Sequence, residues 1–130
     1  LGASVVTLSD LQGVADQEYT RKLFEDVLSI RKGKDIGNIG YHPHHLSGEK
    51  AIANSMVAHE TGIRRFDASL GGTGGCVTGA PGNQPTEALV RFFEEKGIQT
   101  GLKQDDVSAL AEFIEKELYR RISLTGKKLF

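Results

Sequence analysis

The bulk composition of the sequence limits the kinds of protein it can encode. Its 130 residues suffice for one domain with a buried core and are too few for two, so we expect one domain over residues 1–130. With 16 basic and 17 acidic residues, the net charge is −1, and we expect neither a nucleic acid nor a membrane partner. A single cysteine excludes an internal disulfide, and no apolar run approaches the roughly 20 residues that span a bilayer.

These features predict a soluble cytoplasmic protein. A location in the mitochondrial matrix is the alternative if the source is eukaryotic. The sequence starts at Leu1, so a targeting peptide would lie upstream of it.

The first part of the chain predicts a strand followed by a helix. Ser4 to Leu8 is a β-branched run typical of a buried strand, and it leads into Ser9-Asp10 and a turn at Gly13. From Gln17 to Ile30, apolar residues recur at helical spacing and predict an amphipathic helix that ends before Gly33. These apolar residues are Tyr19, Leu23, Phe24, Val27, Leu28 and Ile30.

The same order recurs in the middle of the chain. Ile36 to Tyr41 predicts a second strand, which stops at His42-Pro43-His44 because proline is poorly tolerated inside a sheet. A second helix follows Ser47 and ends near Gly62. Its apolar residues are Ala51, Ile52, Met56 and Val57.

A third strand candidate runs from Ile63 to Ser69 and enters a glycine-rich loop. Pro85 begins a third helix, which Gly97 ends. A longer terminal helix is predicted from its apolar residues Val107, Leu110, Ala111, Ile114, Leu118 and Ile122. The loop glycines are Gly71, Gly72, Gly74, Gly75, Gly79 and Gly82.

This alternation of strand and helix predicts an α/β fold with parallel strands joined by right-handed crossovers. A polar or glycine-rich segment follows each predicted strand: Ser9-Asp10, His42 to His45, and Gly71 to Asn83. In α/β folds that edge of the sheet carries the active site. The three segments together therefore indicate a functional site there.

The two histidines at the end of the second strand form a candidate metal site. His42 and His44 are two residues apart, so both rings should project to the same side of the strand. Imidazole binds divalent transition metals, and carboxylate, amide oxygen and water complete sites for magnesium or manganese. The spacing alone fits a pair of solvated loop histidines equally well. His45 breaks the alternation and is better explained as a surface residue or as a neighbour of the ligands.

Three further residues each have a structural and a functional interpretation. Asp10 could orient a ligand histidine or move a proton near the metal, and it fits an Asx turn before Gly13 at least as well. Asn83 could cap the third helix or offer its side-chain oxygen to a metal. Cys76 could be a small buried residue, but its place in a glycine-rich loop favours a reactive thiol.

Several motifs, in this order and at these intervals, resemble a known family. They are Asp10-Leu11-Gln12-Gly13-Val14, His42-Pro43-His44, Ala51-Ile52-Ala53-Asn54, Asp67-Ala68-Ser69, Gly74-Gly75-Cys76, Gly82-Asn83, Thr86-Glu87 and Lys96-Gly97-Ile98-Gln99-Thr100-Gly101. The chain resembles the last three β/α units and terminal helices of 3-hydroxy-3-methylglutaryl-CoA lyases. The likeness covers nearly all of the sequence.

The resemblance implies the C-terminal part of a TIM (β/α)8 barrel, about three β/α units plus the terminal helix. It implies a divalent cation, Mg²⁺ or Mn²⁺, with His42, His44 and Asn83 as ligands. Asp10 would be an acid-base residue beside the metal, and Cys76 a catalytic thiol on a mobile loop. The family's first-strand aspartate ligand and neighbouring arginine have no counterpart here and would lie upstream of Leu1.

The implied reaction is a metal-dependent retro-Claisen cleavage of 3-hydroxy-3-methylglutaryl-CoA to acetyl-CoA and acetoacetate. It implies an acyl-CoA substrate and a homo-oligomer in the full-length enzyme. The sequence departs from the family pattern next to the substrate. His45 replaces an acidic residue, Leu11 a small polar one, and the cysteine loop is about two residues shorter before Asn83. A related hydroxyacyl-CoA is therefore an alternative substrate.

Two kinds of alternative remain. The first is another enzyme of the same superfamily: a Claisen-type synthase of the isopropylmalate or homocitrate kind, or an aldolase acting on a hydroxy-oxo acid. Gly74-Gly75-Cys76 favours the lyase. The second is an inactive metal-binding fragment that needs a partner chain, because three strands cannot close a barrel of eight.

Overall fold

The computed structural model describes residues 2–31, 36–44, 47–74 and 82–125. These residues form three strands and four α-helices. In chain order they are β1 (Val6–Asp10), α1 (Gln17–Arg31), β2 (Ile39–Pro43), α2 (Gly48–Glu60), β3 (Arg65–Phe66), α3 (Thr86–Glu95) and α4 (Gln104–Thr125). Short 3₁₀ helices, η1 (Ile36–Asn38) and η2 (Leu70–Gly72), precede β2 and follow β3.

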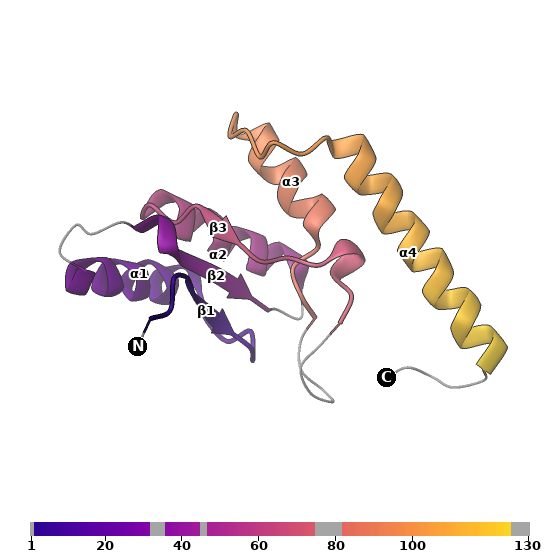
Figure 1. Ribbon diagram of the computed structural model, residues 1–130, viewed down its shortest axis with the longest axis horizontal. Helices are drawn as coiled ribbons and strands as arrows, with labels where there is room; N and C mark the ends of the chain where they lie inside the picture. The colour runs from indigo at the N-terminus through magenta and orange to yellow at the C-terminus, as the bar shows by residue number, and fades with distance from the viewer. Residues whose placement is uncertain (1, 32–35, 45–46, 75–81, 126–130) are drawn as a thin grey trace.

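The three strands form one parallel sheet in the order β1-β2-β3. Val6 pairs with Ile39 and Asp10 with Pro43, while Tyr41 pairs with Phe66 on the other side of β2. Each helix contacts the next along the chain, and α4 runs along α3 away from the sheet (Figure 1). The predicted α/β fold with parallel strands is confirmed, and the carboxyl ends of all three strands meet at one edge.

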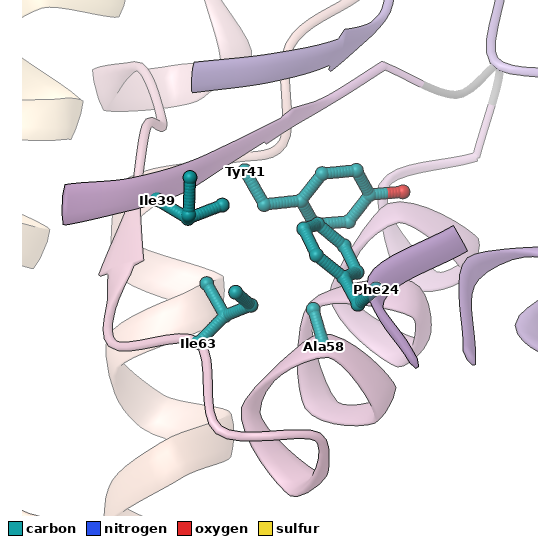
Figure 2. Packing of buried hydrophobic residues seen from close by; sticks show 5 residues of the cluster. All are labelled: Phe24, Ile39, Tyr41, Ala58 and Ile63. Atoms are coloured by element: carbon teal, nitrogen blue, oxygen red, sulfur yellow. The ribbon is translucent and has the colours of Figure 1, made fainter. Parts of the chain in front are cut away.

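The main core lies between the central strand and the first two helices (Figure 2). Tyr41 of β2 packs edge-to-face on Phe24 of α1, with 5.0 Å between ring centroids. Burial raises the pKa of the Tyr41 hydroxyl. The cluster consists of Phe24, Ile39, Tyr41, Ala58 and Ile63. Helices α1 and α2 are thereby fixed against one face of β2.

A second cluster attaches α3. Ile52 of α2 packs with Leu89 and Phe93 of α3, and Phe66 of β3 lies 5.4 Å from Phe93 between ring centroids. Strand β3 and helices α2 and α3 are thus packed against one another.

The sequence predicts the helices better than the strands. The helix predicted from Gln17 to Ile30 is α1, whereas the first strand lies two residues later than predicted, at Val6–Asp10. The region predicted as a strand from Ile36 begins as η1, and only two residues of the third predicted strand pair in the sheet. Strand bounds depend on where the neighbouring strand lies, which a local pattern does not contain.

The expectation that the first strand is buried is wrong for the described chain. Val5 and Val6 are 42% and 44% exposed, because β1 has a hydrogen-bonded neighbour only on its β2 side. A groove of about 540 Å³ lies beside β1, lined in part by Leu8, Tyr19 and Leu23. None of the helices in the described ranges has the length and hydropathy needed to cross a bilayer.

Candidate metal centre at the carboxyl edge of the sheet

Successive side chains of β2 point to opposite faces of the sheet, so this strand separates the core from the candidate site. Ile39 and Tyr41 point to the helices, and Gly40 and His42 take the opposite face. A Cβ atom at Gly40 would lie only 2.8 Å from Thr7 Oγ1 of β1. Glycine at position 40 therefore leaves room for the Thr7 side chain of the neighbouring strand.

The two histidines converge, as their spacing predicts. His42 Nε2 and His44 Nε2 are 2.9 Å apart, and the rings meet edge-to-face at 4.7 Å between centroids. His44 is 2% exposed and His42 is half-buried. Two ligand atoms that bind one ion at about 2.1 Å and at right angles lie about 3 Å apart. The spacing of the two Nε2 atoms fits a shared cation.

The surroundings of His42 favour its neutral form. Burial lowers the pKa of His42, and the nearby His44 lowers it further. Asp67, which follows β3, partly opposes this shift, because its negative charge and a hydrogen bond to its backbone both raise the pKa of His42. A neutral imidazole keeps the lone pair that a metal needs, so the pKa shift is in the direction that supports metal binding.

Asn83 lies beside His44. The two residues form an isolated antiparallel bridge, which brings together segments 39 residues apart in sequence. The Asn83 Nδ2 group donates to the carbonyl oxygen of Thr73 at 2.9 Å. Its Oδ1 atom and His42 Nδ1 are buried and have no hydrogen-bond partner among the described residues. A buried, unpaired amide oxygen is costly, and a cation would satisfy it.

The alternative role of Asn83 as a helix cap is wrong. Helix α3 begins three residues after it, at Thr86, and Pro85 occupies the N-cap position. Its side chain bonds back to Thr73 instead of forward to the helix. Asn83 thus belongs to the edge of the sheet and not to α3.

The available donor atoms fit a small divalent cation. Two imidazole nitrogens and one amide oxygen form a mixed nitrogen-oxygen set of the kind that carboxylate or water completes in sites for magnesium or manganese. Within the described residues, no group of three His, Cys, Asp and Glu side chains could hold a metal. The resemblance implies the Asn83 amide as the third protein ligand.

Asp10 has the turn-closing role that its sequence context favours. Its carboxylate accepts hydrogen bonds from the backbone of Val14 at 3.2 Å and of Ala15 at 2.8 Å. Its backbone carbonyl accepts the His44 N–H at 3.0 Å. Asp10 therefore connects the end of β1 to the histidine segment through its backbone, and its proposed acid-base role stays a prediction.

The glycines before Asn83 serve close packing. Gly72 and Gly74 have positive φ angles, 64° and 86°, and a Cβ on Gly72 would lie 3.1 Å from the backbone oxygen of Asn83. Segments 71–74 and 82–85 can therefore lie directly against each other. Cys76 and His45 lie outside the described residues.

The sequence interpretation missed Gln84. Its side chain is fully buried and joins Ser55 of α2 to the backbone of Asp67. A glutamine between a glycine-rich loop and a helix carries no local sign of burial, because its partners come from other elements.

Successive parallel β/α units with polar side chains gathered at the carboxyl edge define an α/β enzyme-type scaffold. A family model described as HMGL-like matches residues 1–114. The chain belongs to this family, as its motifs suggest.

Individual relatives agree on the family and differ in activity. A hydroxymethylglutaryl-CoA lyase of Bacillus subtilis is 30% identical over 131 residues, covering 99% of this chain and 42% of that protein. A 4-hydroxy-2-oxovalerate aldolase of Dechloromonas aromatica is 40% identical over 116 residues, or 87% of this chain and 30% of that protein.

A solved structure of an HMG-CoA lyase from Acinetobacter baumannii, in complex with coenzyme A and 3-methylmalate, is also similar. It matches with a TM-score of 0.77 and 36% identity, over 85% of this chain and 36% of that one. The chain thus has the fold of part of a TIM barrel and spans well under half the length of these relatives.

Proposed function

We propose that this chain carries the metal-binding part of a carbon-carbon lyase. The proposed reaction is the retro-Claisen cleavage of 3-hydroxy-3-methylglutaryl-CoA, or of a related hydroxyacyl-CoA, to acetyl-CoA and an oxo acid such as acetoacetate. The observation that best supports this proposal is that His42 Nε2 and His44 Nε2 lie 2.9 Å apart, with the buried, unpaired Asn83 oxygen in the adjoining segment.

In this proposal His42, His44 and Asn83 hold Mg²⁺ or Mn²⁺. When bound, the ion supplies Lewis-acid chemistry that makes the tertiary hydroxyl of the substrate easier to deprotonate. The protein's own contribution is to fix the three donors. His42 lies in β2 and His44 follows the strand directly, while Asn83 is tied to Thr73 and paired with His44.

The reaction needs two proton transfers. The substrate hydroxyl loses a proton, the carbon-carbon bond breaks, and its electron pair stays on the acyl-CoA carbon, which then takes up a proton to become the methyl group of acetyl-CoA. We propose Asp10 as an acid-base group, because its backbone is bonded to His44. We propose Cys76 as the donor to the carbanion, on the strength of its glycine-rich loop.

The choice of an acyl-CoA substrate is supported by a relative. The similar HMG-CoA lyase was solved with coenzyme A and 3-methylmalate. We further propose a cytoplasmic or mitochondrial-matrix enzyme that forms a homo-oligomer in its complete form.

The direct test measures acetyl-CoA release from 3-hydroxy-3-methylglutaryl-CoA by the complete protein. Activity should disappear with EDTA and return with Mg²⁺ or Mn²⁺. The Cys76→Ser variant should be slower while it still binds Mn²⁺. Failure of every hydroxyacyl-CoA to react would refute the lyase. An unaffected Cys76→Ser enzyme would leave the thiol without a catalytic role.

A hydroxy-oxo-acid aldolase is the second candidate, and the 40% identity to 4-hydroxy-2-oxovalerate aldolase favours it. Such an enzyme would release pyruvate from a 4-hydroxy-2-oxo acid without coenzyme A. A Claisen-type synthase would instead condense acetyl-CoA with an oxo acid. Assaying the three reactions side by side separates these activities.

The remaining alternative is a metal-binding fragment that is inactive alone. Purified as 130 residues, it would bind Mn²⁺ without turnover and gain activity only when a chain supplying the rest of the barrel is added. Full activity of the 130 residues alone would exclude this alternative.

A further inference from the structure

Gln84 follows the proposed ligand Asn83 and is 0% exposed. Its Oε1 atom accepts a hydrogen bond from Ser55 Oγ at 2.8 Å, and its Nε2 group donates to the Asp67 carbonyl oxygen at 2.9 Å. Ser55 is also 0% exposed. Both ends of the buried amide are therefore bonded.

These bonds join the elements that surround the histidine pair. Ser55 belongs to α2, which follows the histidine segment. Asp67 follows β3, and its N–H donates to the carbonyl oxygen of Tyr41, the residue before His42, at 2.9 Å. The Gln84 carbonyl also accepts the Ser69 N–H at 3.1 Å. Gln84 is thus attached to the segment that follows β3 through a backbone bond to Ser69 and a side-chain bond to Asp67.

We propose that Gln84, supported by Ser55, is a positioning residue for the metal centre. It fixes the backbone next to Asn83, so that Asn83 stays paired with His44, and it ties the Asp67 carbonyl after β3 to the same segment. This inference rests on the proposed function, because it takes Asn83 and the histidines to be ligands. It adds to that function the residues that set the geometry of the ligands.

A positioning role differs measurably from a general packing role. Loss of a merely structural hydrogen bond lowers stability and leaves the metal affinity of the folded protein unchanged. Loss of a group that orients a ligand typically weakens metal binding by about 10–100-fold. Metal affinity, measured apart from turnover, is therefore the informative quantity.

The test is Mn²⁺ titration of the complete protein, followed by electron paramagnetic resonance, with thermal unfolding measured in parallel. Gln84→Met keeps the side-chain length and removes both hydrogen bonds, and we expect about 10–100-fold weaker Mn²⁺ binding. Gln104→Met is the matched control. The Gln104 side chain also bonds to two partners: its Nε2 group donates to the Glu87 carbonyl of α3 and to Ser108 Oγ within α4, and neither partner belongs to the proposed ligand set or bonds to it. Its Mn²⁺ affinity should stay within about twofold of the wild type.

Ser55→Ala gives a milder second variant, which carries the test if Gln84→Met does not fold. It should weaken Mn²⁺ binding in the same direction, and its effect should not add fully to that of Gln84→Met, because both remove the same bond. If both variants bind Mn²⁺ like the wild type, the positioning role is wrong while the metal centre stands. An equal loss of Mn²⁺ affinity in Gln104→Met would also overturn the positioning role of Gln84. If the wild type itself does not bind Mn²⁺, the proposed metal centre fails and the positioning role fails with it.

Discussion

The two faces of β2 differ in how completely their atoms are satisfied. On the helix side, Ile39 and Tyr41 pack into a closed apolar cluster, and the Tyr41 hydroxyl lies 3.5 Å from Thr20 Oγ1. On the other side, the two His Nε2 atoms lie within hydrogen-bond distance of each other, at 2.9 Å, and His42 Nδ1 lacks a partner among the described residues. One strand thus carries a face packed into the core and a face with a buried ring nitrogen that has no hydrogen-bond partner among the described residues.

We expect the face of β2 that carries Ile39 and Tyr41, the packing face, to serve stability. Under the proposed function, the face that carries Gly40 and His42, with His44 beyond the strand, is the binding face. Each buried polar group without a hydrogen bond costs about 1–3 kcal/mol, so such atoms persist only where the surrounding structure holds them. Here the core on the opposite face provides that support. Substitutions on the two faces should therefore change different measured quantities.

The largest expected effect is on the packing face. Phe24→Ala removes a fully buried ring from the Tyr41 cluster and should lower the free energy of unfolding by about 3–5 kcal/mol. Urea denaturation of the complete protein measures this loss. A loss below about 1 kcal/mol would show that this cluster is not the main core.

On the binding face, His44→Ala should weaken Mn²⁺ binding by more than about 100-fold, since losing a ligand exceeds the loss of an outer partner. Its effect on the free energy of unfolding should be smaller than that of Phe24→Ala. Titration with Mn²⁺ tests the first statement and urea denaturation the second. His59→Ala is the control, because His59 packs on Phe93 outside the site. Equal affinities of the His44 variant and this control would remove His44 from the ligand set.

Gly40 tests the contact between the binding face and β1. Gly40→Ala places a methyl group 2.8 Å from Thr7 Oγ1 and should cost about 1–3 kcal/mol of stability. Combining it with Thr7→Ala removes the opposing oxygen and should restore most of the loss. Thermal or urea unfolding of the two single variants and the double variant gives the answer. Additive losses would show that the clash does not lie at this pair.

The smallest expected effect concerns pH. Burial and the charge of Arg64 lower the pKa of His59 below its usual value of 6.5, against the smaller opposing effect of Glu60. The unfolded chain therefore takes up this proton first, and the His59 contribution to stability declines as the pH falls through 6.5 toward the folded pKa. Unfolding at pH 8 and pH 5.5 should show a smaller pH dependence in His59→Gln than in the wild type. Identical pH dependence in both would contradict the assignment.

Much of the fold follows from local sequence patterns. Apolar spacing from Tyr19 to Leu28 predicts α1 well, because one amphipathic face suffices to define a helix. β3 is predicted less well: of the seven residues from Ile63 to Ser69, Arg65 and Phe66 form the strand. Its length depends on pairing with β2, which is not a local property.

The candidate site divides in the same way. The common orientation of His42 and His44 follows from the two-residue period of a strand and is confirmed. The pairing of His44 with Asn83 and the burial of Gln84 depend on how distant segments meet, so local pattern does not predict them. The resemblance to a family implied Asn83 as a ligand, and only the structure revealed that Gln84 is buried and bonded next to it.

The exposed side of β1 has a practical consequence for handling the chain. Unpaired backbone groups beside exposed Val5 and Val6 form a template for adding a strand from another molecule. The adjoining groove offers apolar surface for the same purpose. Preparations of the 130-residue polypeptide should therefore self-associate as their concentration rises. The Val6→Lys variant should stay monodisperse.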